Sequence, residues 1–314
     1  MNPRIAIMGS FVADLAFRTP AMPGWGETIL GRSFRLGPGG KGSNQAVAAA
    51  RLGAEVSFIS RLGRDSFGEL ARQMYRQEGI DAQCVFETDE ATGAAAILID
   101  EYRGENGIIV VPGACFVLSE EQLRQSAATI AASRIFLTQL EQDLTVVERG
   151  LRLAHDAGVR TILNPAPAAA LSESIYPLCD YLTPNESEAA ALTGLPVANA
   201  EQALAAANHL LARGVRNVIV TLGAGGALLR TPHTTAQVPA VDAGPVAETT
   251  GAGDAFNGGF AVALAEGMSP ADSVAFACAV AGLSVTRPGT APSMPTRAEV
   301  DALRSKISPN VLDS

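Results

Sequence analysis

The chain has 314 residues, of which 47% are hydrophobic and 18% charged, a composition typical of compact globular proteins rather than disordered or fibrous ones. Its 23 Lys and Arg residues are outnumbered by 32 Asp and Glu residues, and the net charge of -9 argues against nucleic acid or an anionic membrane as partner. Gly9 breaks the first apolar run and Glu266 the longest small-residue stretch, so we expect no signal peptide, no membrane span and a cytoplasmic protein.

Short apolar runs alternate with amphipathic helical patterns along most of the chain. The runs are Ile5–Met8, Val56–Ser60, Ile135–Thr138, Thr161–Leu163, Tyr181–Thr183 and Val218–Thr221. The helical patterns include Phe67–Gln77, Leu144–Ala157 and Ala200–Arg213. Because strands that alternate with helices build parallel sheets, the sequence predicts a three-layer α/β/α domain with a mostly parallel central sheet.

Two segments depart from this rhythm. Glu27–Leu36 alternates apolar and polar residues, which predicts a half-exposed antiparallel strand. Ala94–Ile99 and Gly107–Val111 flank the turn Tyr102–Asn106, which predicts a hairpin. We therefore expect one domain over residues 1–314, with a small β-sheet lid formed from about 11–36 and 93–112.

The first glycine cluster, Gly37–Asn44, follows the alternating segment and precedes a predicted helix, Gln45–Leu52. Glycines let a polar ligand approach the backbone, while Lys41 and Asn44 supply donors, so the cluster predicts a hydroxyl- or phosphate-binding loop. The residue after Lys41 is Gly42 rather than Ser or Thr, which excludes a Walker A loop.

The same cluster matches G-x-G-x-x-G through Gly37, Gly39 and Gly42, the pattern of dinucleotide-binding loops. That alternative is disfavoured because the preceding segment alternates instead of running continuously apolar. Its acidic residue, expected about 20 positions later, would be Asp65, which lies in a Gly-bounded turn. A turn without ligand would explain the glycines but not the neighbouring Lys41.

The second glycine cluster, Glu248–Gly259, precedes an Ala-rich helix that runs to about Leu264. Small residues at a helix start leave backbone N–H groups free to hold an anion. Asp254 falls in the first turn, where an acidic residue is favourable on electrostatic grounds alone. Beside an anion-binding turn, however, its carboxylate is better explained as a general base that accepts a hydroxyl proton.

The two clusters together resemble the signature motifs of the ribokinase, or PfkB, family of carbohydrate kinases, and the likeness extends over the whole chain. The matching segments are Gly39–Ala46, Asn164–Pro167, Thr183–Glu186, Thr250–Phe256 and Val285–Arg287. The resemblance implies transfer of the γ-phosphate of Mg²⁺-bound ATP to the primary hydroxyl (O5) of a pentose, D-ribose first. The alternatives are 2-deoxyribose, another sugar or a nucleoside; outside the family, a dinucleotide-dependent enzyme or a non-catalytic sugar-binding protein is less favoured.

The resemblance also assigns roles to individual residues. It makes Asp254 the base and Gly251, Ala252 and Gly253 the cradle of the transferred phosphate. The residues assigned to the sugar are Val12, Asp14, Gly40, Lys41, Asn44, Glu141 and Asp254. Those assigned to the nucleotide and its Mg²⁺ are Asn185, Glu188, Thr221, Gly223, Gly225, Gly226, Gly253 and Cys278.

A monovalent cation, potassium by preference, is implied as an activator. Its ligands would come from Glu248, Thr250, Ser284, Arg287, Gly289 and Ser293, some through backbone carbonyls. The family also implies a homodimer that pairs through the lid, consistent with the apolar residues Leu30, Phe34 and Leu36. Taken singly, Asp14 could instead be a turn residue, Glu141 a helix-start acid and Asn185 a helix cap.

Four positions depart from the family pattern. Val12 stands where an Asn usually contacts the sugar; a sugar hydroxyl left unpaired there costs ~1 to 3 kcal/mol, which makes a 2-deoxypentose credible. Cys115 and Cys278 replace residues that are commonly Asn or His, and Glu248 replaces the Asp of the cation site. These two cysteines, with Cys84 and Cys179, form no CxxC pair, which predicts buried reduced thiols.

Overall fold

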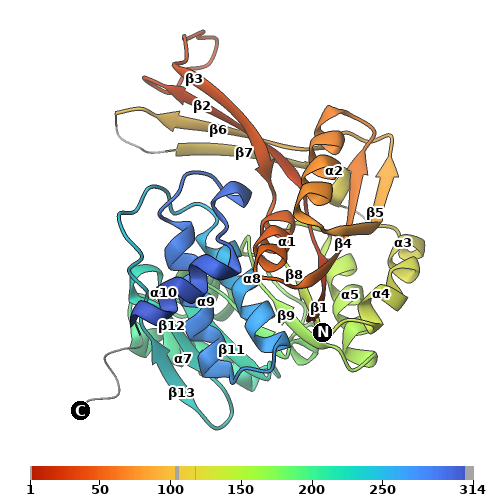
Figure 1. Cartoon of the computed structure of the whole chain (residues 1–314), viewed down its shortest axis with the longest axis vertical. Coiled ribbons are helices and arrows are strands. Elements are labelled where there is room, and N and C mark those ends of the chain that lie inside the picture. Colours follow the sequence, from red (N-terminus) through yellow and green to blue (C-terminus); the bar gives the residue numbers. More distant parts are fainter. Residues whose placement is uncertain (1, 103–105, 117, 308–314) are drawn as a thin grey trace.

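The computed structural model describes residues 2–102, 106–116 and 118–307, and its centre is a nine-stranded sheet covered by helices on both faces (Figure 1). In spatial order the strands are β13 (Thr235–Val238), β12 (Ala227–Arg230), β11 (Asn217–Thr221), β10 (Tyr181–Leu182), β9 (Arg160–Leu163), β8 (Ile135–Thr138), β1 (Arg4–Met8), β4 (Glu55–Gly63) and β5 (Asp81–Thr88). Every pair from β11 to β5 is parallel, whereas the pairs β11–β12 and β12–β13 are antiparallel. The predicted α/β class is confirmed.

The central strands are mostly apolar because both faces of the sheet are covered. In β1, Ile5 and Ile7 pack into one core cluster, whereas Ala6 and Met8 pack into the other. The first cluster is shared with α1 (Lys41–Arg51), α2 (Ser66–Glu78), α8 (Ala252–Ala265), α9 (Pro270–Ser284) and α10 (Arg297–Ile307). The second is shared with α3 (Glu120–Gln125), α4 (Ala127–Ala131), α5 (Leu144–Asp156), α6 (Glu186–Thr193) and α7 (Ala200–Ala212).

All six predicted apolar runs form strands, and the three named helical patterns correspond to α2, α5 and α7. The sequence reasoning did not find β5, β12 or β13. Each of these lies at or next to an edge of the sheet, where β5 and β13 mix polar and apolar residues and so lack the continuous apolar signal of the central strands.

A second, four-stranded sheet stands above the main body in Figure 1. Its order is β3 (Ser33–Gly39), β2 (Val12–Thr19), β6 (Thr92–Asp100) and β7 (Asn106–Gly113). The prediction of a strand over Glu27–Leu36 was wrong in its first half. The β2–β3 register pairs Arg18 with Ser33, and β2 ends one residue later, so the chain before Ser33 has little strand left to pair with. The predicted hairpin is present as β6–β7, but residues 103–105 of its turn lie outside the described residues.

Cross-strand pairing separates the two faces of this small sheet. Asp14 pairs with Gly37 and Ala95, so these residues lie on one face. Phe17 pairs with Phe34 on the other face, where their rings lie 4.9 Å apart between centroids. The face that carries Asp14 is turned toward α1 and the main body, because Thr290 from the loop before α10 donates to Asp14.

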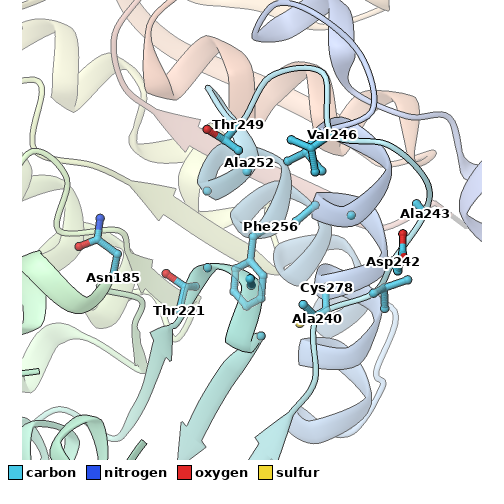
Figure 2. Close-up of a pocket in the computed structure, with 18 of the residues that line it drawn as sticks. Asn185, Thr221, Ala240, Asp242, Ala243, Val246, Thr249, Ala252, Phe256 and Cys278 are labelled. Atoms are coloured by element: carbon cyan, nitrogen blue, oxygen red, sulfur yellow. The ribbon is translucent and has the colours of Figure 1, made fainter. Parts of the chain in front are cut away.

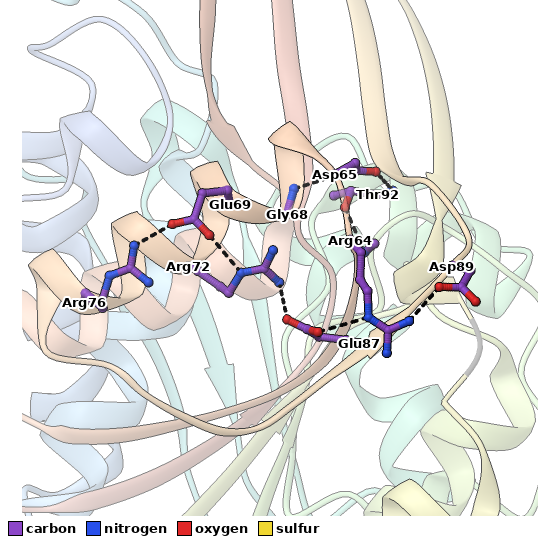
Figure 3. A network of polar contacts seen from close by, with 10 residues as sticks. Arg64, Asp65, Gly68, Glu69, Arg72, Arg76, Glu87, Asp89 and Thr92 are labelled. Atoms are coloured by element: carbon purple, nitrogen blue, oxygen red, sulfur yellow. Dashed lines mark hydrogen bonds and ion pairs between the residues drawn. The ribbon is translucent and has the colours of Figure 1, made fainter.

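A polar network joins the small sheet to α2 (Figure 3). Asp65 caps α2 by accepting from the Gly68 amide at 2.8 Å, and its second oxygen accepts from the Thr92 amide at the start of β6 at 2.7 Å. Burial would raise the pKa of Asp65, but these backbone hydrogen bonds outweigh it and hold the pKa below its ordinary value. Asp65 is thus a helix cap, which removes the acidic residue that the dinucleotide alternative required.

The four cysteines are buried and unpaired with one another, as predicted. Among the described residues, no helix has both the length and the apolar character needed to cross a bilayer.

Candidate active site

The first glycine cluster places α1 directly beside the β1–β2 connection. Gly40 has φ 87°, and a Cβ on it would lie within 2.9 Å of backbone atoms of Ser10, Phe11 and Val12, so only glycine fits. The helix therefore starts at Lys41, four residues earlier than the predicted Gln45, and Lys41 and Asn44 project from its first turns.

The second glycine cluster starts α8. Gly251 is the N-cap with φ 83°, and Asp254 lies in the first turn as predicted. The Ala252 amide already donates to the Thr249 carbonyl at 3.2 Å. A Cβ built on Gly253 would have no neighbour within 4 Å, so the helix start presents an open backbone surface at that residue.

The helices α1 and α8 approach each other unusually closely. A Cβ on Gly258 would lie 2.6 Å from the Ala48 Cβ and 2.9 Å from the Gln45 carbonyl oxygen, so a larger residue would push the helices apart. This approach brings two amide side chains of α1 to the carboxylate of α8: Asn44 Nδ2 donates to Asp254 Oδ2 at 2.9 Å, and Gln45 Nε2 donates to Asp254 Oδ1 at 3.0 Å. Each oxygen of the Asp254 carboxylate, which is only 6% exposed, therefore accepts a hydrogen bond from an amide side chain.

Lys41 is surrounded by carboxylates. Burial lowers the pKa of its ammonium group, but the charges of Asp254, Glu141 and Glu188 together outweigh burial and raise the pKa above its ordinary value. Lys41 is therefore a cation near three anions. Glu141 is placed by the Lys41 amide, which donates to its Oε2 at 2.9 Å, and by the Ser10 hydroxyl.

Asn185 and Glu188 form a capping box at the start of α6. Asn185 Oδ1 accepts from the Glu188 amide at 2.8 Å, and Glu188 Oε2 accepts from the Asn185 amide at 2.9 Å. Burial raises the pKa of Glu188, although the Asn185 amide and the charge of Lys41 oppose it. The cap interpretation of Asn185 is correct, and the same two residues also line a cavity.

Asp14 projects from β2 against the glycine loop, where a Cβ on Gly39 would lie 2.3 Å from its carboxylate. Burial, with the charge of Glu141, raises the pKa of Asp14 to about 6, although a hydrogen bond from Thr290 and the charge of Arg35 act in the opposite direction. Val12, two residues earlier in β2, is buried.

A cavity of about 910 Å³ lies between the loop after β11, the segment before α8, and α9 (Figure 2). Figure 2 shows Asn185 and Thr221 on one side of it, Val246 and Asp242 on the other, and Phe256 between them. Of the residues predicted to line a nucleotide site, Asn185, Thr221, Gly223, Gly226, Gly253 and Cys278 line this cavity. Gly225 is not among the residues that line it, although Gly223 and Ala224 of the same short 3₁₀ turn and the following Gly226 are.

A second, polar cavity of about 170 Å³ adjoins the first. Its walls include Lys41, Glu188 and Asp254, and three residues line both cavities: Asn185, Thr221 and Gly253. A large, mostly apolar cavity that meets a small charged one at a helix N-terminus suits transfer of an anionic group between two ligands. The carboxylate of Asp254 lines the smaller cavity, and the residue before it, Gly253, lines both.

The residues assigned to the cation occupy two neighbouring loops. Glu248 Oε2 accepts from the Gly289 amide at 2.8 Å and lies 3.9 Å from a guanidinium nitrogen of Arg35. The Arg287 guanidinium donates to the Glu299 carboxylate instead. This hydrogen bond, together with one from the Thr296 amide, lowers the pKa of Glu299 to about 2. The hydroxyls of Ser284 and Ser293 donate to carbonyls of their own turns, whereas Thr250 lies next to the Gly251 cap.

Sequence reasoning assigned no role to several polar residues that support this site, although Asn164, Thr183 and Gln45 fall in segments that match the family. Asn164 and Thr183 follow β9 and β10 and line the smaller cavity, together with Asn257, whose side chain bonds Thr183 and the Gly253 carbonyl. Their position directly after parallel strands was a usable signal, because ligands bind at the carboxyl ends of such strands. The signal for Gln45 was a polar residue within the apolar face of a helix.

Comparison with known proteins was consistent over the full length. Residues 2–297 match the pfkB family of carbohydrate kinases. A ribokinase from Haemophilus influenzae is 42% identical over 300 residues, which are 95% of this chain and 97% of the relative. A deoxyribokinase from Salmonella typhi is 35% identical over 93% of this chain and 95% of the relative. The structure of Arabidopsis thaliana ribokinase complexed with ribose and ATP superposes with a TM-score of 0.90 at 33% identity, covering 96% of this chain and 99% of the other.

The raised pKa of Asp14 predicts a pH-dependent cost in stability. The ordinary value is 3.8, so stability is highest below that pH and falls as pH rises through about 6, because the fold disfavours the ionised carboxyl. Asp14→Asn removes this effect. Between pH 5 and pH 8 we expect the free energy of unfolding of the variant to gain about 1 kcal/mol on wild type, measured by urea unfolding. A difference that is the same at both pH values would contradict the assignment.

Proposed function

Because the chain belongs to the pfkB family of carbohydrate kinases, we propose that it is an ATP-dependent sugar kinase that transfers the γ-phosphoryl group to the primary hydroxyl (O5) of D-ribose. One observation carries the proposal: the Asp254 carboxylate lines the small polar cavity from the first turn of α8, directly after Gly253, which lines both cavities. A base at this point can accept the hydroxyl proton where the phosphoryl group arrives.

The larger cavity suits the nucleotide, whereas of the residues assigned to the sugar only Lys41 and Asp254 line the smaller one. The larger cavity has the volume and mostly apolar lining of a nucleotide site, and the open backbone of Gly253 at the start of α8 forms part of its wall. There the helix N-terminus favours the negative charge of the transferring group. The Asn44 Oδ1 atom is buried without a hydrogen-bond partner among the described residues, so a sugar hydroxyl can supply the missing donor.

Magnesium fits the donor set. Mg²⁺ binds proteins through one or two carboxylates and otherwise keeps waters and phosphate oxygens. Glu188 and Asn185, which line the smaller cavity, would hold it, and no cluster of three His, Cys, Asp or Glu ligands occurs in the described residues. Bound there, the ion would neutralise phosphate charge. Lys41, kept cationic by its neighbours, would attract the same phosphates.

A 2-deoxypentose is the second candidate substrate. Val12 is buried and lies two residues before Asp14 on the same face of β2, where it offers no hydrogen bond to a sugar hydroxyl. A deoxyribokinase is also among the relatives at 35% identity.

A potassium ion fits the loops 247–251 and 285–293 only in part. The loops meet through hydrogen bonds from the Ala247 and Glu248 amides to the Val285 carbonyl, and backbone carbonyl oxygens are the ligands that replace the hydration shell of potassium. The Glu248 carboxylate, however, already faces the Arg35 guanidinium, so we propose that Arg35 and the ion compete for it.

A homodimer through the small sheet is proposed because part of the sheet face away from Asp14 is apolar and uncovered, although Ala13 and Leu15 on the same face pack against the core. Phe34, Leu36, Ile109 and Val111 on this face are exposed by 44 to 68%. A contiguous apolar face of this kind marks a protein interface, and a second copy would bury it with matching chemistry.

Replacing the base should abolish turnover without preventing binding. For Asp254→Asn we expect kcat for D-ribose with Mg-ATP to fall about 10² to 10⁴-fold, the usual range for loss of a general base. Ribose affinity, measured by calorimetry, should stay within a few-fold of wild type. Near-normal turnover of this variant would rule out the base assignment.

The substrate preference tests the role of Val12. We expect Val12→Asn to raise the ratio of kcat/KM for ribose over 2-deoxyribose by about tenfold, because the new amide pairs a hydroxyl that only ribose carries. ADP release, measured with each sugar for both proteins, gives the ratio. An unchanged ratio would mean that Val12 does not face the sugar's second carbon.

Potassium binding can be tested by thermal unfolding, without measuring kinase activity. We expect KCl to raise the Tm relative to the same concentration of tetramethylammonium chloride, since an ion that binds only the folded state stabilises it. Arg35→Gln should enlarge the potassium effect by freeing Glu248. Equal Tm values in the two salts for both proteins would exclude the site.

Oligomeric state is tested by charging the exposed face. Wild type should have a mass near twice 32.4 kDa by light scattering, and Phe34→Glu should reduce it to that of one chain. Trp25→Ser, which removes an equally apolar but fully exposed residue outside the sheet strands, is the matched control and should stay dimeric. A monomeric wild type would contradict the proposal.

A further inference from the structure

Gln45 is a fully buried amide on α1 that makes hydrogen bonds with all of its polar atoms. Its Nε2 donates to Asp254 Oδ1 at 3.0 Å and to Asn164 Oδ1 at 3.1 Å, and its Oε1 accepts from Gln139 Nε2. A buried polar side chain is costly unless its hydrogen bonds are made, so this network stabilises one arrangement of the amide.

The orientation of the Gln45 amide follows from its neighbours. Asn164 Nδ2 donates to the Thr183 carbonyl at 3.2 Å, which turns Asn164 Oδ1 toward Gln45. If the Gln45 amide were reversed, its oxygen would face the oxygens of both Asn164 and Asp254. Only the orientation with the NH₂ group toward the carboxylate satisfies all the polar atoms of Gln45 itself.

The consequence for Asp254 is a fixed carboxylate plane. Gln45 holds Oδ1 and Asn44 holds Oδ2, so rotation about the carboxylate's terminal bond would break both hydrogen bonds. Each oxygen can still accept a second hydrogen bond, which leaves room for a substrate hydroxyl. Proton transfer requires such a hydroxyl within hydrogen-bonding reach of a correctly oriented oxygen.

We propose that Gln45, itself held by Gln139, is a positioning residue that orients the Asp254 carboxylate for proton transfer from the sugar. The proposal rests on the proposed sugar-kinase function and deepens it. Gln45 lies outside both cavities' linings and acts through Asp254 rather than on the substrates. Asn44 differs, since its free Oδ1 is available to the sugar.

The test uses Gln45→Met, which keeps the length of the side chain and removes both of its N–H donors. We expect kcat to fall about 10- to 100-fold, while KM for ribose and for ATP stays within about threefold, because a misplaced base slows chemistry without weakening binding. A kcat within threefold of wild type would overturn the proposal.

A double-variant cycle separates positioning from general structural damage. In the Asp254→Asn background, Gln45→Met should lower the residual kcat by less than about threefold, because the group that it positions is already lost. Effects that multiply would overturn the proposal. Near-normal turnover of Asp254→Asn alone would overturn the base assignment, whereas a normal kcat for Gln45→Met beside an inactive Asp254→Asn would overturn only the positioning role.

A second variant and a matched control complete the test. If Gln45→Met does not fold, Gln139→Met removes only the donor to Gln45 Oε1 and should lower kcat about threefold or more with unchanged KM; an unchanged kcat would overturn the proposal. Tyr75→Phe removes a buried hydrogen bond of 2.8 Å between Tyr75 on α2 and Ser43, which lies on α1 like Gln45. Neither residue hydrogen-bonds Asp254. The kcat of Tyr75→Phe should match wild type.

Discussion

The site depends on the close approach of α1 and α8 at Gly258. With a side chain at that position, the helices would separate, and neither Asn44 nor Gln45 would reach the Asp254 carboxylate. The two glycine clusters, more than 200 residues apart in the sequence, thus act as one unit: the first supplies amide donors and the second the carboxylate and an open helix start. The core beneath α1 and α8 stabilises this contact.

Lys41 and Asp254, which both line the smaller cavity, have different electrostatic surroundings. Lys41 remains cationic because three carboxylates surround it, and it balances part of their charge in a partly buried space. Asp254 is held by neutral amides rather than by an ion pair, so its lone pairs stay accessible to a substrate. The open backbone at Gly253 faces both cavities, where an anionic group in transit would pass.

The sequence was most informative where local chemistry has few alternatives. Continuous apolar runs predicted the central strands, and the glycine clusters predicted the loops around Lys41 and Asp254, because few other residues fit such backbone positions. It was least informative at edges and at long range. The first half of Glu27–Leu36 alternates like a strand but lacks a partner, and the start of α1 at Lys41 depends on the packing of Gly40 against the β1–β2 connection. The Gln139–Gln45–Asp254 chain joins three distant segments, and no local pattern specifies it.

The account's central claim is that the γ-phosphoryl group of a nucleotide bound in the large cavity is transferred to the primary hydroxyl of D-ribose. The most direct measurement is an NMR spectrum of the product formed from Mg-ATP and D-ribose labelled with ¹³C at C5. The account predicts one phosphorylated product whose C5 signal is split by coupling to ³¹P, formed in equal amount to ADP. Phosphate on the anomeric carbon, or ADP release without a sugar phosphate, would contradict it.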